Sequence, residues 1–191
     1  PSKDVVRSAT PFFSYYVVET LYQAGRGQAA LHELRRWLKM AETPPGTFWE
    51  YWEPHFSRSH GWSCAPSILL PQMVLGVRMT ETAFNRFEVR PHHWDQLDWA
   101  RGSVPLSGGG SIEVAWKRGQ ALFQLQVESP ADKLPSIHLP DLFNAYRLEV
   151  YQDGEQGLQL VKTPVRRSEG RISLQMPSGG RYLVRLKEDR P

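Results

Sequence analysis

The sequence contains a single cysteine, Cys64, among its 191 residues. One thiol cannot close an internal disulfide or form a zinc site of several cysteines, so an apolar core must hold the fold together. No apolar run reaches ~18 residues, and we therefore expect neither a transmembrane helix nor a membrane partner. Fifteen glycines and fifteen prolines without a period exclude a collagen, and a hydrophobic content of 40% excludes a disordered tail. The cellular location stays open.

Positive charge is in slight excess, with a formal net charge of +3, and it is concentrated at one end. Residues 161–191 carry eight basic and three acidic side chains. Several of the basic residues alternate with Tyr182, Val184 and Leu186, which is typical of the outward face of a strand. The basic residues of this stretch include Arg166, Arg167, Arg171, Arg181, Arg185, Lys187 and Arg190. We interpret them as a solvated sheet face and expect no nucleic-acid partner.

Residues 1–80 have the pattern of helices. Thr10 before Pro11 predicts a helix start, because the hydroxyl can cap the helix and proline lacks only an N–H that the first turn does not use. This helix ends near Gly25 and is apolar nearly all round. A second, amphipathic helix is predicted at about 28–42, and a third, also apolar, at about 60–75 with bends at Pro66 and Pro71.

From about Ala83 the hydrophobic period becomes two. Seven or eight short strands separated by glycine-rich turns predict an antiparallel β-sandwich. The chain is thus predicted to be α+β, with a helical part at 1–82 and a sandwich domain at 83–191. Three helices that are so apolar do not close a helical domain. We expect them to be the C-terminal end of a larger one, with exposed apolar surface that could support self-association.

The most unusual stretch is TFWEYWE at 47–53, which places aromatic rings next to acids. Aromatic faces stack on the C–H faces of sugars while carboxylates bond to hydroxyls, and a carboxylate among tryptophans is suited to acid–base work. Trp49, Glu50 and Trp52 are therefore candidate site residues. The alternative is structural: Thr47 and Glu50 have the spacing of a capping box that merely starts a helix.

The other reactive side chains give weaker signals. His60 could donate to a sugar hydroxyl, or it could be a first-turn polar residue of a helix capped by Ser59. His60 and Cys64 could share a helical face, but no third group orients them as a nucleophile pair. The spacing of His55, His60, Cys64, His92 and His93 fits no metal-ligand pattern, so we expect no metal. Trp94 and Trp99 are expected in the core.

These motifs, taken together, resemble a known family, the bacterial α-L-rhamnosidases, which are inverting glycosidases built on an (α/α)₆ barrel. The likeness covers about residues 8–127 and is to the C-terminal part of that family. It rests on TPFFS at 10–14, YQAG at 22–25, TFWE at 47–50, SRSHGWS at 57–63, VLGV at 74–77, FEVRP at 87–91, LDWARGSVP at 97–105 and the strand at 112–116. The resemblance implies that residues 1–82 are the last helices of the catalytic barrel.

The resemblance also implies roles for individual residues. Glu50, in the Thr-x-Trp-Glu motif, would be the general base that takes a proton from the attacking water. His60 would contact the rhamnose ring, and Trp49 and Trp52 would wall the sugar site. Inversion needs a second carboxyl group ~6.5–9.5 Å from the base. Glu53 is the only local candidate and we reject it, because the family's general acid lies upstream of this sequence.

The expected activity is removal of terminal α-L-rhamnose from a glycan or glycoside, with inversion and without a cofactor. Because the acid is missing, this chain by itself is expected to be inactive. The rival interpretation is a non-catalytic carbohydrate-binding or structural module, in which the aromatic residues bind glycan and the acids only position it. A different sugar hydrolase on the same barrel is a further alternative.

Overall fold

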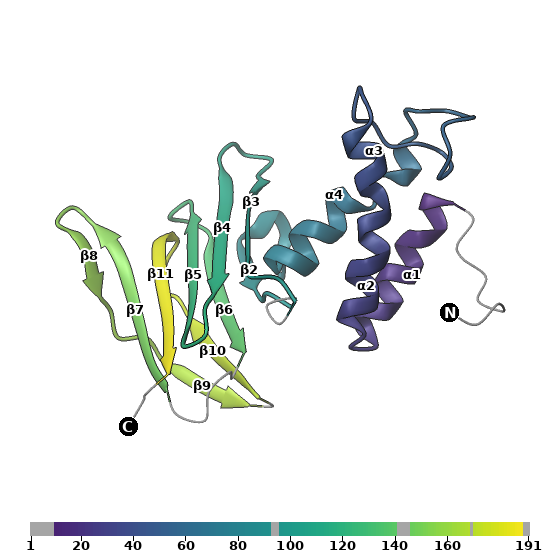
Figure 1. Ribbon diagram of the computed structural model, residues 1–191. Helices are drawn as coiled ribbons and strands as arrows, with labels where there is room; N and C mark the ends of the chain where they lie inside the picture. The colour runs from purple at the N-terminus through teal and green to yellow at the C-terminus, as the bar shows by residue number, and fades with distance from the viewer. Residues whose placement is uncertain (1–9, 93–95, 141–145, 169, 189–191) are drawn as a thin grey trace. The chain divides into compact units, whose positions relative to one another are not determined.

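The fold is described from a computed structural model that covers residues 10–92, 96–140, 146–168 and 170–188. The chain divides into two compact units, Pro1–Leu70 and Pro71–Pro191, which we call the helical unit and the β unit and describe separately. Figure 1 labels their elements. None of the described helices is both long and apolar enough to cross a membrane.

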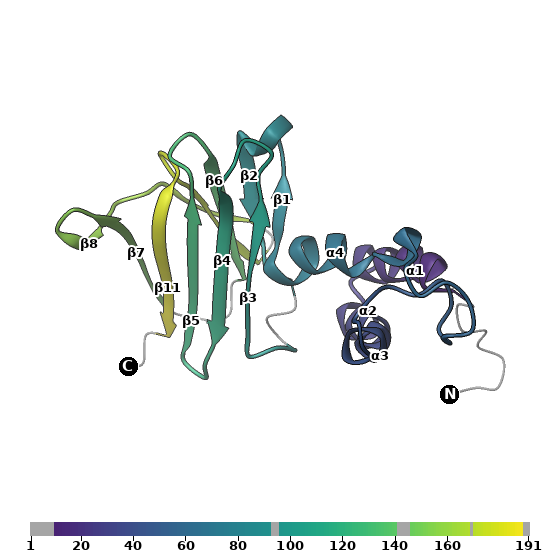
Figure 2. The ribbon, with the colours of Figure 1, turned by 90° about the horizontal axis from the view of Figure 1, so that it is seen from above.

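The helical unit begins with α1 (Pro11–Gln23), as the sequence predicts. The Thr10 hydroxyl accepts a hydrogen bond from the backbone N–H of Phe13 at 3.2 Å, which confirms the predicted cap. The predicted second helix is present as three consecutive pieces, α2 (Gly27–Leu34), the 3₁₀ turn η1 (Arg35–Trp37) and α3 (Leu38–Glu42). Figure 2 shows the helical unit from a second direction.

Only one side of α1 is buried within the helical unit. Val18 and Tyr22 face the other helices, whereas Phe13 and Tyr16 are 57% and 48% exposed. The predicted exposure of apolar surface on this helix is therefore confirmed. Association with a second copy stays a prediction.

The predicted helix at 60–75 is not continuous. It consists of the 3₁₀ turn η2 (Gly61–Ser63), the short helix α4 (Pro66–Leu69) and a π-helical segment, η3 (Leu70–Leu75). Pro66 occupies the first turn of α4, where a missing N–H costs nothing. Pro71 cannot donate a helical hydrogen bond, which accounts for the wider turn that follows it.

The β unit is built from two sheets. The first has five strands in the order β1-β2-β6-β10-β9, and the second has six in the order β3-β4-β5-β11-β7-β8. Their bounds are β1 (Val77–Met79), β2 (Arg86–Val89), β3 (Trp99–Pro105), β4 (Ser111–Arg118), β5 (Leu122–Ser129), β6 (Leu134–Pro140), β7 (Tyr146–Gly154), β8 (Gly157–Leu160), β9 (Val165–Ser168), β10 (Arg171–Gln175) and β11 (Gly180–Glu188). Their arrangement can be followed in Figures 1 and 2.

A single apolar core joins the two sheets. Phe87, Ile137 and Ile172 reach it from the first sheet, and Phe123 and Tyr182 from the second, all with no exposed surface. Two sheets that share one core form the predicted sandwich. One pairing differs from the expected antiparallel pattern, because β2 and β6 run parallel in the register Phe87↔Pro135.

The core also includes the residues that lead into the first strand. Val74, Leu75 and Val77 are buried in it, and the indole N–H of Trp116 donates to the carbonyl of Val74 at 2.9 Å. These contacts hold residues 74–77 in the core of the β unit, which begins at Pro71. The division between a catalytic helical part and a sandwich domain at 82/83 stays a prediction. Trp99 corrects an expectation: it is 69% exposed on the edge strand β3, and Trp94 lies outside the described residues.

Candidate active site

The segment at 43–60 is a long loop of the helical unit, and its local structure tests the capping-box interpretation of TFWE. No helix starts at Glu50. The Thr47 hydroxyl donates to the backbone carbonyl of Arg58 instead of capping a helix, so the capping-box interpretation is wrong. Glu50 is therefore not explained as a helix-starting residue.

The same loop folds back so that its two motifs lie side by side. The backbone N–H of Glu50 donates to the carbonyl of Ser57 at 2.9 Å, and that of His60 donates to the carbonyl of Phe48 at 2.8 Å. These two bonds pair the strand-like stretch that carries TFWE with the stretch that carries SRSH. The sequence-predicted residues Glu50 and His60 are thus brought to the same pair of antiparallel segments.

The Glu50 side chain is half-buried and is held at one oxygen. Its Oε2 atom accepts a long hydrogen bond, 3.4 Å, from the backbone N–H of Ser57. Glu53, by contrast, extends from the surface and pairs with Lys39, with 3.0 Å between Oε2 and Nζ. An exposed pair of this kind contributes little to stability, and it directs the Glu53 carboxylate toward a surface lysine.

The two candidate tryptophans have different environments. Trp49 is 1% exposed, and its backbone N–H points at the sulfur of Met40 at 3.4 Å. Its indole Nε1 is buried and has no hydrogen-bond partner among the described residues. A buried donor without a partner is uncommon in folded proteins and calls for a bound water or ligand.

Trp52 is only partly buried, and its ring is sandwiched. The Trp52 ring meets the Trp37 ring edge-on, with 4.8 Å between the two centroids. The Arg36 guanidinium carbon lies 3.8 Å from the centroid of the Trp52 ring. Arg36 is in turn paired with Glu33. The sequence analysis missed Arg36, although its place on the amphipathic helix near a tryptophan-rich loop could have indicated it.

His60 lies beside an exposed aromatic residue that belongs to the SRSHGWS motif but to which the sequence analysis gave no role in the site. Its ring meets Trp62 at a centroid distance of 5.5 Å, and Trp62, 72% exposed, contacts Phe12 of α1 at 5.7 Å. The 3₁₀ turn η2 begins directly after His60 without a side-chain cap, so Ser59 does not cap a helix as the alternative required. Within the described part of the chain, no group of three or more His, Cys, Asp or Glu side chains is placed to hold a metal ion.

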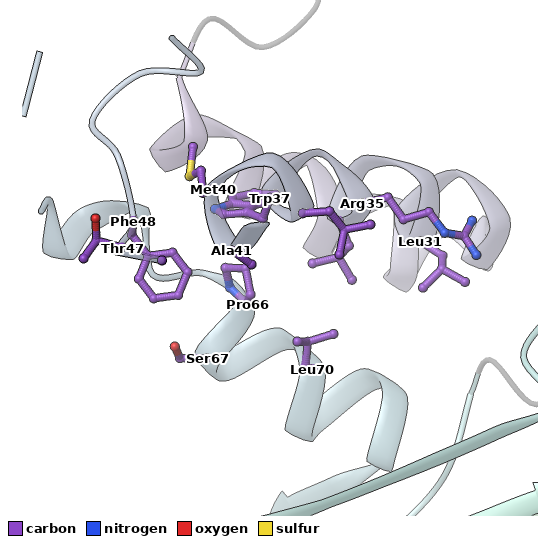
Figure 3. A pocket seen from close by; sticks show the side chains of 13 residues that line it. Leu31, Arg35, Trp37, Met40, Ala41, Thr47, Phe48, Pro66, Ser67 and Leu70 are labelled. Atoms are coloured by element: carbon purple, nitrogen blue, oxygen red, sulfur yellow. The ribbon is translucent and has the colours of Figure 1, made fainter. Parts of the chain in front are cut away.

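A separate apolar groove of about 360 Å³ runs along the helical unit next to this loop (Figure 3). Leu31, Trp37 and Met40 form one side, and Phe48 and Leu70 approach from the loop and from the segment after α4. The groove does not include Glu50, Trp52 or His60. Its lining is mostly apolar, with Arg35, Thr47 and Ser67 as the polar side chains, and a sugar site would need more hydrogen-bonding groups.

Comparison with known proteins shows which proteins this chain is similar to. Residues 76–152 match the family described as the bacterial alpha-L-rhamnosidase C-terminal domain. The fold is similar to an α-L-rhamnosidase from Dictyoglumus thermophilum, with a TM-score of 0.71 and 20% identity over 93% of this chain and 21% of that one. No curated protein sequence matches the chain.

Two further solved structures of rhamnosidases are also similar to this chain. A GH78 family rhamnosidase of Bacillus sp. GL1 is 30% identical over 72% of this chain and 16% of its own, with a TM-score of 0.59. An α-L-rhamnosidase from Aspergillus terreus is 17% identical over 90% of this chain and 18% of its own, with a TM-score of 0.61. The chain therefore spans about a fifth or less of the length of these structures. In each comparison the part of this chain that is matched is longer than the β unit. The similarity therefore extends into the helical unit.

Proposed function

We propose that this chain supplies the water-activating side of a rhamnoside-hydrolysing active site. The proposal rests on its similarity to the C-terminal portion of α-L-rhamnosidases, whose bacterial C-terminal domain matches residues 76–152. The parent protein would remove terminal α-L-rhamnose with inversion. The helical unit would be the C-terminal part of its (α/α)₆ barrel. The observation that carries the proposal is the backbone pairing that places Glu50 and His60 on adjacent segments of one loop.

In this proposal Glu50 accepts a proton from the attacking water. Its Oε2 atom is oriented by the Ser57 N–H, which leaves the carboxylate with further lone pairs for a water molecule. A general base of this kind contributes about 10²–10⁴-fold to the rate. His60 would donate to a hydroxyl of the rhamnose ring, close to the exposed face of Trp62.

Trp52 and Trp49 would shape the sugar site in different ways. Trp52, held between Trp37 and Arg36, is the better placed of the two to wall the site. Trp49 is too deeply buried to present a ring face, and we propose that it supports the loop from behind. Its buried indole N–H would find a partner in a bound water.

The general acid would come from a part of the protein outside these 191 residues. Glu53 is the nearest other carboxylate in the motif, but it is exposed and paired with Lys39. We therefore expect this chain alone not to hydrolyse an aryl α-L-rhamnoside at a useful rate. Robust turnover by the isolated chain would mean that the acid is present within it, and Glu53 would be the first residue to test.

The experiment is a matched pair of substitutions in the longest natural protein that contains this sequence. With an aryl α-L-rhamnoside, Glu50→Gln should lower kcat by about 10²–10⁴-fold while thermal stability is unchanged, because the amide keeps the size but cannot take the proton. Glu53→Gln, which has the same chemistry on the same loop, should cost far less. Full activity in Glu50→Gln would end the catalytic proposal and favour a carbohydrate-binding or structural module.

A further inference from the structure

The outer face of the six-stranded sheet contains a groove of about 570 Å³ that the proposed hydrolysis does not use. It is formed entirely within the β unit. Its volume lies in the range of about 300–1,000 Å³ that is typical of small-molecule sites. It lies across β4, β5 and β11, at the end where β5 finishes and β11 begins. The course of these strands can be followed in Figure 1.

Strand register places two rows of side chains across this groove. In the first row Glu113 of β4 is opposite Glu128 of β5, and Glu128 is opposite Arg181 of β11. In the second row Arg101 of β3 is opposite Ala115 of β4, which is opposite Gln126 of β5. Because alternate residues of a strand point to one face, both rows face away from the sandwich core.

Arg181 links three neighbouring strands, β5, β11 and β7, along the groove. Its Nε and Nη2 atoms donate to the two oxygens of Glu128 at 2.9 and 3.1 Å, and its Nη1 atom donates to Asp153 of β7 at 3.1 Å. These carboxylates keep the pKa of the Arg181 guanidinium above its ordinary value. The three planar groups are therefore held in one orientation and retain unused donors and lone pairs that can face a ligand.

The balance of charge indicates the class of ligand. Three carboxylates, from Glu113, Glu128 and Asp153, outnumber the guanidinium groups of Arg101 and Arg181. An anion would therefore be repelled on balance. Exposed apolar surface is present at one end, where Leu158 of β8 is 53% exposed beside Asp153.

We propose that this groove is a second saccharide-binding site, which takes a neutral sugar and is separate from the site around Glu50. Vicinal hydroxyls of a pyranose can bond to a carboxylate and a guanidinium at once, and its C–H face can pack on Leu158. Such a site would hold a glycan on the β-sandwich while chemistry proceeds elsewhere. It does not depend on whether this chain takes part in hydrolysis.

The test is a titration of the ¹⁵N-labelled 191-residue chain with L-rhamnose, D-glucose and D-galactose, followed by NMR. At least one sugar should shift the backbone amides of β4, β5 and β11. Glu113→Gln and Arg181→Met should each weaken that binding about tenfold, since each removes a charged hydrogen-bonding group. The matched controls are Glu155→Gln and Arg166→Met, two exposed positions outside the groove, and they should bind as the unsubstituted chain does.

Glu113→Gln keeps the test decisive if Arg181→Met impairs folding, because the hydrogen bond of the Glu113 side chain within the described residues is to the neighbouring Ser111 hydroxyl. The proposal is overturned if none of the three sugars shifts the groove amides, or if binding survives both groove variants. Shifts confined to residues 47–62 would also overturn it and would leave the proposed active site intact. Displacement of the sugar by inorganic sulfate would identify an anion site and reject the assignment.

Discussion

Replacing Gly76 by alanine should destabilise the β unit far more than the same change at any exposed glycine. Gly76 has φ +83°, a region that residues with a Cβ avoid. A Cβ built there would overlap the backbone carbonyl of Arg90 and the nitrogen of Pro91, which belong to main chain that cannot swing aside. The close approach is required because the Arg90 N–H donates to the Gly76 carbonyl at 2.8 Å.

The magnitude follows from a comparison with Gly157. Gly157 has nearly the same φ, +88°, but no atom of the described residues beyond its chain neighbours lies within 4 Å of the Cβ that alanine would add. Gly157→Ala should therefore cost only the conformational term, about 1–2 kcal/mol. Gly76→Ala carries that term plus the steric overlap, and we expect a loss of more than ~4 kcal/mol in the free energy of unfolding.

The assay is urea unfolding followed by the NMR signal of the Trp116 indole N–H, which reports on the β unit alone because it is bonded to the Val74 carbonyl. Gly108→Ala is the second control, since Gly108 has neither a left-handed φ nor a neighbour within 4 Å, and it should change stability by no more than about 0.5 kcal/mol. A Gly76→Ala protein as stable as Gly157→Ala would refute the packing described for this turn.

Three further predictions concern other parts of the molecule. Trp116→Phe should destabilise the β unit by about 2–4 kcal/mol in urea unfolding, because it removes a buried ring and leaves a carbonyl unpaired, whereas Trp99→Phe on the exposed edge should have little effect. Burial lowers the pKa of His138, and Glu88 only partly opposes this. The unfolded chain therefore binds a proton at His138 more readily than the folded chain does. The free energy of unfolding should hold its full value above pH ~6.5 and decrease as the pH falls below it. His138→Gln should remove this decrease. Arg36→Met should loosen the loop at 47–60, seen as faster amide hydrogen exchange there, because it removes the cation over the Trp52 ring; unchanged exchange would contradict that role.

Much of the β-sandwich could be predicted because its pattern is local. Tyr182, Val184 and Leu186 recur at every second position among residues that include Arg181, Arg185 and Lys187, and the structure buries the three completely or nearly so. The parallel pairing of β2 with β6 could not be predicted in this way, because it depends on which strands become neighbours and not on the pattern within either one. Trp99 was misplaced for a related reason: its register opposite Lys117 turns it outward on an edge strand.

The candidate site shows the same limit. TFWE and SRSH are identifiable in the sequence, but the hydrogen bonds that bring them together join residues seven to twelve positions apart across an irregular loop. The capping-box prediction was wrong because the Thr47 hydroxyl bonds to the Arg58 carbonyl, a partner that local spacing does not reveal. The groove on the β unit was not foreseen at all, since Arg181 and Glu128 are 53 positions apart and meet only through strand register.

The most direct test of the central claim, that Glu50 activates the attacking water, is chemical rescue in the longest natural protein that contains this chain. Glu50→Ala should remove the base and open space on the water side of the sugar. Added azide should then displace the aglycone of an aryl α-L-rhamnoside and restore turnover, and the product should be the β-configured rhamnosyl azide, with the anomeric centre inverted. Absence of rescue, or an α-configured azide, would contradict the placement of Glu50 on the water side.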